Sequence, residues 1–237
     1  MAANNEVGTI LPIDKYVTII RQKNSQTLIH SDMSQTLGKA ENISVGDLDA
    51  ATFTSHKFGG PTGIGILYCK NFDVMDSLIH GGSQEFVKRA GTYSAHQIVG
   101  MGKAVELLEF SNYRNCIEVR QYAEKKLKEI GCIINCEDSL RLCNTISAIL
   151  PNMIAENIVK KLSELGIFIS AGSACNSYEK TASYVLKSMG VSDVDAYNTI
   201  RISLNRFTLK EEIDEFIITL NNLKDTYNGQ QNILCQL

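Results

Sequence analysis

The strongest indication of the fold lies in the stretch Thr52-Phe53-Thr54-Ser55-His56-Lys57-Phe58-Gly59-Gly60-Pro61-Thr62-Gly63-Ile64-Gly65. Its β-prone start ends in a polar Ser55-His56-Lys57, and a loop with four glycines and one proline leads into a second apolar run. Glycine allows tight turns and the close approach of a ligand, whereas proline fixes φ and removes a hydrogen-bond donor. The pattern predicts two strands with Lys57 at the turn between them, either as an ordinary surface lysine or as a functional one.

Three further segments supply residue types that, together with a lysine, suit chemistry on an amino acid. Asp32 follows an apolar run, Cys175 lies in a loop of small residues, and Arg201 lies in a β-like run. A lysine can hold an aldehyde cofactor as a Schiff base, and a carboxylate can pair with the pyridinium nitrogen of pyridoxal phosphate (PLP). A cysteine can act as a nucleophile, and an arginine can bind a carboxylate through two parallel hydrogen bonds. The set favours a functional role for the lysine.

The composition is that of an ordinary globular protein that can bury a substantial core. Of the 237 residues, 44% are hydrophobic and 21% are charged, and the net charge of −3 contains no block of like charges. We therefore expect neither a nucleic-acid surface nor a membrane surface. No apolar run approaches the roughly 20 residues that span a bilayer. The first residues also lack the basic and apolar regions of a signal peptide.

The cysteines favour a reducing, cytoplasmic compartment over metal binding. There are seven of them, an odd number without zinc-finger spacing, at positions 69, 116, 132, 136, 143, 175 and 235. Cys132 and Cys136 are four residues apart, but they lie in a strand-like run and no second pair of ligands follows. We expect mostly structural, reduced thiols and no metal site.

The order of elements is typical of an α/β protein. Apolar spacing predicts helices at 13–23, 95–110, 112–130, 155–166, 182–189 and 210–227, and strands at 27–31, 47–54, 65–69, 132–136, 142–150, 167–170 and 199–204. The last ten residues are rich in Gln and Asn and are expected to be loose. We place a domain boundary near Ser111, between 1–111 and 112–237. In such sheets, ligands bind at the carboxyl ends of strands, where Asp32 and Lys57 would both lie.

Six motifs in order along the chain carry a resemblance to a known family. They are Ala3-Asn4-Asn5-Glu6-Val7-Gly8, His30-Ser31-Asp32-Met33-Ser34-Gln35, Ser55-His56-Lys57, Gly91-Thr92, Ser173-Ala174-Cys175 and Arg201-Ile202-Ser203-Leu204. The chain resembles a cysteine desulfurase of the NifS type, a class V member of the fold type I PLP-dependent enzymes. The resemblance implies that 1–111 is the C-terminal part of a PLP-binding large domain, a mainly parallel sheet with helices. It implies a small α+β domain at 112–237 that carries the cysteine loop.

The resemblance also implies roles for residues around the cofactor, PLP. Lys57 would carry PLP and move the Cα proton of the substrate, and Asp32 would pair with the pyridine N–H. Gln35 and Asn5 would bond to the O3′ side of the cofactor or to the neighbouring substrate. Each of these four residues lies in one of the six motifs that carry the resemblance.

Further roles follow from the same resemblance. Thr54 and His56 would hold the phosphate, with His56 also close to the catalytic lysine, and Thr92 would reach the phosphate of the other subunit in a homodimer. Arg201 would bind the carboxylate of L-cysteine. Cys175 would attack the substrate's sulfur, which leaves L-alanine and a persulfide on the enzyme. A thiolate that must travel suits a loop of small residues.

The implied function is desulfuration of L-cysteine, with the persulfide passed to an unidentified acceptor protein for iron–sulfur clusters or other thio-cofactors. Departures from the family pattern include Phe86, where a second arginine is usual, and the absence of the N-terminal part of the family chain. Two alternatives stay open. One is a selenocysteine lyase or another class V enzyme, and the other is a shortened, non-catalytic fragment for dimerisation or sulfur relay.

Overall fold

The chain divides into two compact units. The computed structural model describes residues 1–41, 44–108, 110–172 and 182–234. Unit 1 comprises Met1–Asn4 and Ile10–Phe110, and unit 2 comprises Asn5–Thr9 and Ser111–Leu237. The division after Phe110 lies beside the boundary expected from the sequence, but the short segment Asn5–Thr9 belongs to unit 2 rather than to the first 111 residues. That the two units are separate folding domains stays a prediction.

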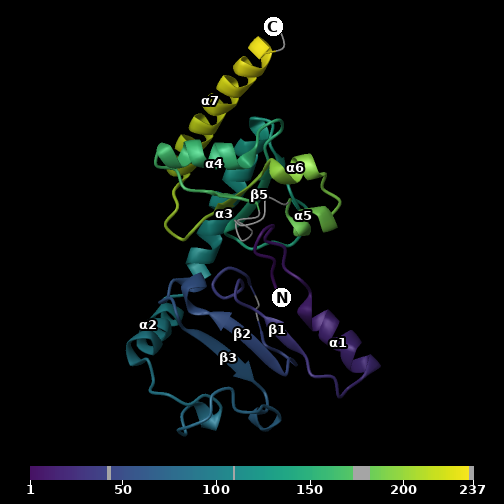
Figure 1. The fold of residues 1–237 in the computed structure, drawn as a ribbon, viewed down its shortest axis with the longest axis vertical. Helices are drawn as coiled ribbons and strands as arrows, with labels where there is room; N and C mark the ends of the chain where they lie inside the picture. The colour runs from purple at the N-terminus through teal and green to yellow at the C-terminus, as the bar shows by residue number, and fades with distance from the viewer. Residues whose placement is uncertain (42–43, 109, 173–181, 235–237) are drawn as a thin grey trace. The chain divides into compact units, whose positions relative to one another are not determined.

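Unit 1 contains a three-stranded sheet that presents the candidate cofactor residues. Its strands are β1 (His30–Asp32), β2 (Ala50–Thr54) and β3 (Gly65–Cys69), in the order β1-β2-β3 (Figure 1). β1 and β2 run parallel, whereas β2 and β3 are antiparallel with Thr54 opposite Gly65. The expectation of a mainly parallel sheet was therefore wrong: this sheet is small and mixed. The glycine-rich turn is too short for a crossover, so the chain returns antiparallel.

Unit 1 also contains helical elements and a modest apolar core, to which the first helix contributes. The helical elements are α1 (Ile13–Lys23), η1 (Ser55–Phe58), η2 (Phe72–Val74), η3 (Glu85–Val87) and α2 (Ala95–Glu106). The bounds of α1 confirm the helix predicted from apolar spacing. The buried cluster comprises Ala2, Val17, Met33, Leu48 and Ala51. Outside this cluster, Asp49 accepts hydrogen bonds from Arg21 (2.5 Å) and from the backbone N–H of Ile29 (2.7 Å), which joins α1 to the sheet.

Unit 2 contains an antiparallel sheet, as expected for an α+β unit. Its strands are β4 (Ile133–Ile134), β5 (Thr145–Ile149), β6 (Ser170–Ala171) and β7 (Thr199–Ser203), in the order β4-β5-β7-β6. All five residues of β5 are buried because the strand is central and covered on both faces. β7 lies between β5 and β6, with Arg201 opposite Ser147 on one side and Ser170 on the other. The central strands therefore place Arg201 on a well-supported element.

Unit 2 also contains the helices α3 (Phe110–Glu129), α4 (Ala155–Glu164), α5 (Tyr184–Ser188), α6 (Asp193–Tyr197) and α7 (Lys210–Leu234) (Figure 1). Those that share the core of the sheet are α3, α4 and α7. On α4, Ala155, Ile158 and Leu162 are buried at helical spacing and join the large apolar core. Two expectations fail here: α6 was not predicted, and α7 continues through 228–234, which were expected to be loose. Once a helix is nucleated, each added residue costs little, so Gln and Asn extend it.

None of the helices in the described part of the chain combines the length and hydropathy needed to span a bilayer.

Candidate functional site

The first group of candidate residues lies at one edge of the unit 1 sheet. Asp32 ends β1 and Thr54 ends β2, and because these strands are parallel with Asp32 opposite Thr52, both carboxyl ends meet at the same edge. Ser34 connects them: its N–H donates to Asp32 Oδ1 (2.8 Å), and its hydroxyl lies 3.0 Å from Thr54 Oγ1. Ser34 lies inside a recognised motif but was not assigned a role. Its sequence signal is the Asx turn that an aspartate forms with the N–H two residues on.

The Asp32 side chain is exposed and is held in its ionised form. Burial raises the pKa of this carboxyl, but hydrogen bonds from the side chain and backbone of Ser34, together with nearby positive charges, outweigh burial and place the pKa below its ordinary value. An ionised carboxylate at the end of a strand can accept a hydrogen bond from a protonated ring nitrogen. Asp32 therefore has the charge state that its expected role requires.

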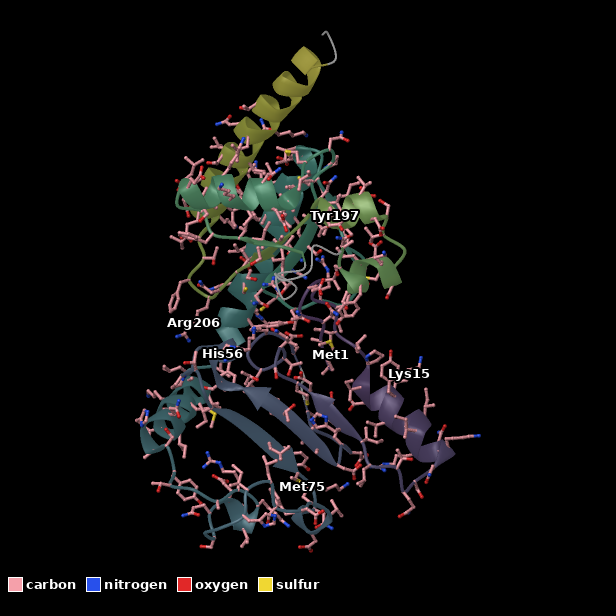
Figure 2. The ribbon with its side chains drawn as sticks, viewed as in Figure 1. Met1, Lys15, His56, Met75, Tyr197 and Arg206 are labelled. Carbon is pink, nitrogen blue, oxygen red and sulfur yellow. The ribbon has the colours of Figure 1, made fainter. Side chains whose placement is uncertain are left out.

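Lys57 and His56 lie on the short helical turn η1, directly after β2. Both side chains are exposed, whereas their neighbours Ser55 and Phe58 are buried and anchor the turn. Figure 2 shows His56 just beyond the end of β2. Gly59 ends the turn with φ of +91°, a conformation that residues other than glycine rarely adopt. The turn therefore presents a lysine and a histidine to solvent at the strand end that also carries Thr54.

Gln35 and Thr92 complete the predicted set in unit 1. Gln35 is half-buried, and its Oε1 accepts a hydrogen bond from Lys39 (3.3 Å). Thr92 is exposed and lies between η3 and α2. Nearby, Phe86 is 74% exposed and stacks on Phe72, with 5.3 Å between the ring centroids. The roles assigned to Gln35 and Thr92 stay predictions.

The second group lies in unit 2, where Arg201 and Asn5 come together. Arg201 Nη1 donates to the backbone carbonyl of Asn5 (3.2 Å), and Nη2 lies 3.5 Å from Ser170 Oγ. Its Nε is buried and has no hydrogen-bond partner among the described residues. The structure thus brings together two predicted site residues that are 196 positions apart. The guanidinium is held in one orientation, as recognition of a carboxylate by two parallel hydrogen bonds requires.

Cys175, the predicted nucleophile, lies outside the described residues. The chain is described on either side of it, where Gly172 donates its N–H to Thr199 (2.8 Å) and Ser183 begins α5. The described cysteines form no disulfide bonds, and burial raises the pKa of the Cys132 thiol to about 11. Among the described residues, no cluster of His, Cys, Asp and Glu has the form of a metal site.

The residues of unit 1 fit pyridoxal phosphate. The ionised Asp32 suits a protonated pyridine nitrogen, and the exposed amine of Lys57 suits an aldehyde. The Thr54 hydroxyl and the His56 ring could donate hydrogen bonds to a phosphate. The arrangement can therefore hold a charged, planar cofactor at the edge of the sheet.

Comparison with known proteins identifies the class. Residues 1–216 match the family described as Aminotransferase class-V, and the chain belongs to this family. It is 35% identical to a cysteine desulfurase IscS of Methanosarcina thermophila over 223 residues, which cover 92% of this chain and 54% of that protein. The chain is thus related to cysteine desulfurases, as the motifs predicted, but it spans about half the length of this curated relative.

Solved structures show the same relationship. A structure described as a NifS-like protein has a TM-score of 0.86 and 35% sequence identity, and covers 95% of this chain and 60% of its own. Another, SspA in complex with cysteine, has a TM-score of 0.71 and 32% identity over 88% of this chain and 58% of its own. The α/β fold predicted from the sequence is therefore confirmed, apart from the strand directions of unit 1.

Proposed function

We propose that this protein serves in the PLP-dependent desulfuration of L-cysteine. The observation that carries the proposal is the parallel pairing of β1 and β2, because it brings Asp32 to the sheet edge where Thr54 and the Lys57 turn lie. The relationship to cysteine desulfurases and the likeness to a structure solved with cysteine support it. PLP, when bound, supplies an electron sink for the bonds at the substrate's Cα.

The unit 1 residues would bind the cofactor and move a proton. Asp32 would accept a hydrogen bond from the pyridine N–H, and its lowered pKa keeps it ionised for this purpose. Thr54 and His56 would hold the phosphate, and Gln35 would bond to the O3′ side of the ring or to the neighbouring substrate. Asn5, which belongs to unit 2, would have the same role as Gln35. Lys57 Nζ would take the Cα proton and return it, because an amine on an exposed turn can reach both the cofactor and the substrate.

Unit 2 would supply the substrate carboxylate site and the nucleophile. Arg201 would bind the carboxylate of L-cysteine. The thiolate of Cys175 would attack the sulfur of the substrate, so that a new S–S bond forms while the C–S bond breaks. The electron pair of that C–S bond stays with the carbon, which takes up a proton and leaves as L-alanine. The enzyme is left with a persulfide for a sulfur-acceptor protein.

Two further points belong to the proposal. Thr92 would serve the site of a second copy in a homodimer. The described cysteines form no disulfide bonds, which suits a reducing, cytoplasmic compartment.

The absorption spectrum of the chain with added PLP tests the proposal. We expect a protein-bound band near the visible edge that changes with L-cysteine and is lost in Lys57→Ala. The matched control is Lys70→Ala, which removes another exposed lysine just after β3 and should leave the band intact. A band that persists in Lys57→Ala would contradict the assignment. Release of alanine, and its loss in Cys175→Ala, would then test the role of the thiol.

A further inference from the structure

The segment Asn5–Thr9 is tied to unit 2 along its whole length. The carbonyl of Gly8 accepts a hydrogen bond from the N–H of Leu142 (2.8 Å), and Thr9 forms a β-bridge with Arg141. Val7 is 1% exposed and packs in an apolar cluster with residues of α5 and α6. The second half of the segment is therefore fixed by backbone pairing and burial.

In the first half, the side chain of Glu6 is hydrogen-bonded to a serine far along the chain. Glu6 Oε2 accepts a hydrogen bond from Ser183 Oγ (2.5 Å), and Ser183 is 2% exposed. The same hydroxyl accepts the N–H of Leu186 (3.2 Å) and so caps the N-terminus of α5. A hydrogen bond to a carboxylate is stronger than a neutral one, and shielding from water strengthens it further. Glu6 is thus hydrogen-bonded to the N-cap residue of α5.

Asn5 precedes Glu6, and its carbonyl is the acceptor for Arg201 Nη1. Of the other guanidinium nitrogens, Nη2 lies at the long distance of 3.5 Å from Ser170 and Nε has no partner among the described residues. The Asn5 carbonyl is therefore the best-placed contact that orients the guanidinium. A displacement of the Glu6 backbone would carry this carbonyl with it.

We propose that Glu6 and Ser183 are positioning residues for Arg201. Their hydrogen bond holds the Asn5 carbonyl against the guanidinium and so aligns Arg201 for a substrate carboxylate. The inference rests on the proposed role of Arg201 and adds two residues to which no role had been assigned.

The test is the ¹⁵N NMR signal of the Arg201 guanidinium in the 237-residue chain, which needs no catalytic turnover. In the unaltered chain we expect slow rotation about the Nε–Cζ bond and distinct Nη signals. In Ser183→Ala and Glu6→Ala we expect rotation at least about tenfold faster, because a hydrogen bond to a charged group no longer holds its neighbour in place. Glu6→Gln keeps an acceptor oxygen and should restore most of the slow rotation.

The matched control is Ser192→Ala. Ser192 caps α6 in the same unit, donates to the carboxylate of Asp195 (2.8 Å) and accepts its N–H (3.1 Å), so it repeats the geometry of Ser183 away from Arg201. Ser192 is exposed, so its loss should lower stability less than the loss of Ser183, and it should leave the Arg201 signals unchanged. Equal effects of Ser183→Ala and Ser192→Ala on these signals, or none from Ser183→Ala, would overturn the inference.

A binding measurement separates this inference from the proposed function. We would titrate L-alanine, which carries the same carboxylate, into the chain supplied with PLP. Arg201→Lys should weaken binding about tenfold or more, since it removes paired hydrogen bonds, and Glu6→Ala should weaken it by a smaller factor. Unchanged affinity in Arg201→Lys would refute the binding of the substrate carboxylate by Arg201, but not the other parts of the proposed function. Weakening in Arg201→Lys but not in Glu6→Ala would refute the positioning role.

Discussion

Unit 1 and unit 2 carry different parts of the candidate chemistry on frameworks of different strength. Unit 1 holds the residues expected to bind the cofactor, on an exposed turn and a short mixed sheet whose largest buried cluster is small. Unit 2 holds Arg201 on a central region of an antiparallel sheet, above a core drawn from α3, α4, β5, β7 and α7. Unit 2, which carries Arg201, is therefore the better ordered of the two units.

A buried ion pair adds to the order of unit 2. Arg141 donates two hydrogen bonds to the carboxylate of Glu124 (2.8 and 3.1 Å), and the side chains are 3% and 8% exposed. Arg120, also largely buried, lies on the same carboxylate at 3.9 Å. Because Arg141 also forms the bridge with Thr9, this network supports the segment that holds Asn5.

The largest effect should follow from breaking this network. Glu124→Ala would leave the Arg141 guanidinium buried without its carboxylate and should lower the free energy of unfolding of unit 2 by about 3–5 kcal/mol. Chemical denaturation would measure it. Glu129→Ala, which removes an exposed partner of Lys126 on the same helix, should cost less than about 1 kcal/mol. Similar losses in the two variants would show that unit 2 does not depend on its buried charges.

The second-largest effect on stability should follow from a cavity in the small core of unit 1. Met33 is 2% exposed in the buried cluster of unit 1, and Met33→Ala should cost about 2 kcal/mol, at the lower end for such changes because few buried neighbours surround it. Hydrogen exchange would measure this loss as weaker protection of the amides of β2, while the protection of the amides of β5 should be unchanged. Leu78→Ala serves as the control, since Leu78 is 81% exposed. Equal protection of β2 in Met33→Ala and the unaltered chain would contradict the prediction.

The alkylation rates of two buried thiols, one in each unit, allow a direct comparison of local stability. Cys69 ends β3 in unit 1, and Cys132 is buried in unit 2, where burial raises its pKa to about 11. Each should react with an alkylating reagent only after local opening. We expect Cys69 to be labelled about tenfold faster than Cys132, because a smaller core opens at a lower free energy. Peptide-resolved mass spectrometry would measure both rates, and the reverse order would break the comparison.

The smallest effect concerns pH and unit 1. A hydrogen bond from the N–H of Ile29 is the largest cause that holds the pKa of Asp49 below its ordinary value of 3.8. Burial raises this pKa, but the Ile29 bond together with the hydrogen bond and the charge of Arg21 outweighs burial. Because the folded-state pKa is the lower one, this stabilisation is complete above pH 3.8 and is lost as the pH falls through the folded-state pKa. Unfolding temperatures at neutral pH and at about pH 3 should therefore differ less in Asp49→Asn than in the unaltered chain. An equal pH dependence would rule out this role.

Much of the local structure could be predicted, and the failures have physical causes. Apolar spacing located α1, β3 and the turn that carries Lys57, because helix and strand periods are local properties. The short helix α6 was missed although Ser192 and Asp195 form a recognisable cap. The mainly parallel sheet was an expectation from the family resemblance. It did not take into account that the short glycine-rich turn before β3 cannot hold the crossover that a parallel return requires.

The candidate site shows the same limit. Residue types alone singled out Asp32, Lys57 and Arg201, because few other side chains can pair with a pyridinium, hold an aldehyde or grip a carboxylate. The partners that orient two of them were not predicted. Ser34 joins Asp32 to Thr54 across two strands, and the Asn5 carbonyl meets Arg201 from the other end of the chain.

The sequence was enough to predict most of the helices and strands, the family and the residue types that the proposed chemistry needs. The folded structure was needed to show that Asn5–Thr9 belongs to unit 2, and that Glu6 is hydrogen-bonded to a serine 177 positions away. The difference arises from the separation of the interacting residues along the chain. Helix periods, turns and caps arise from neighbours in the chain, whereas a hydrogen bond between distant segments exists only after folding has placed both groups out of water.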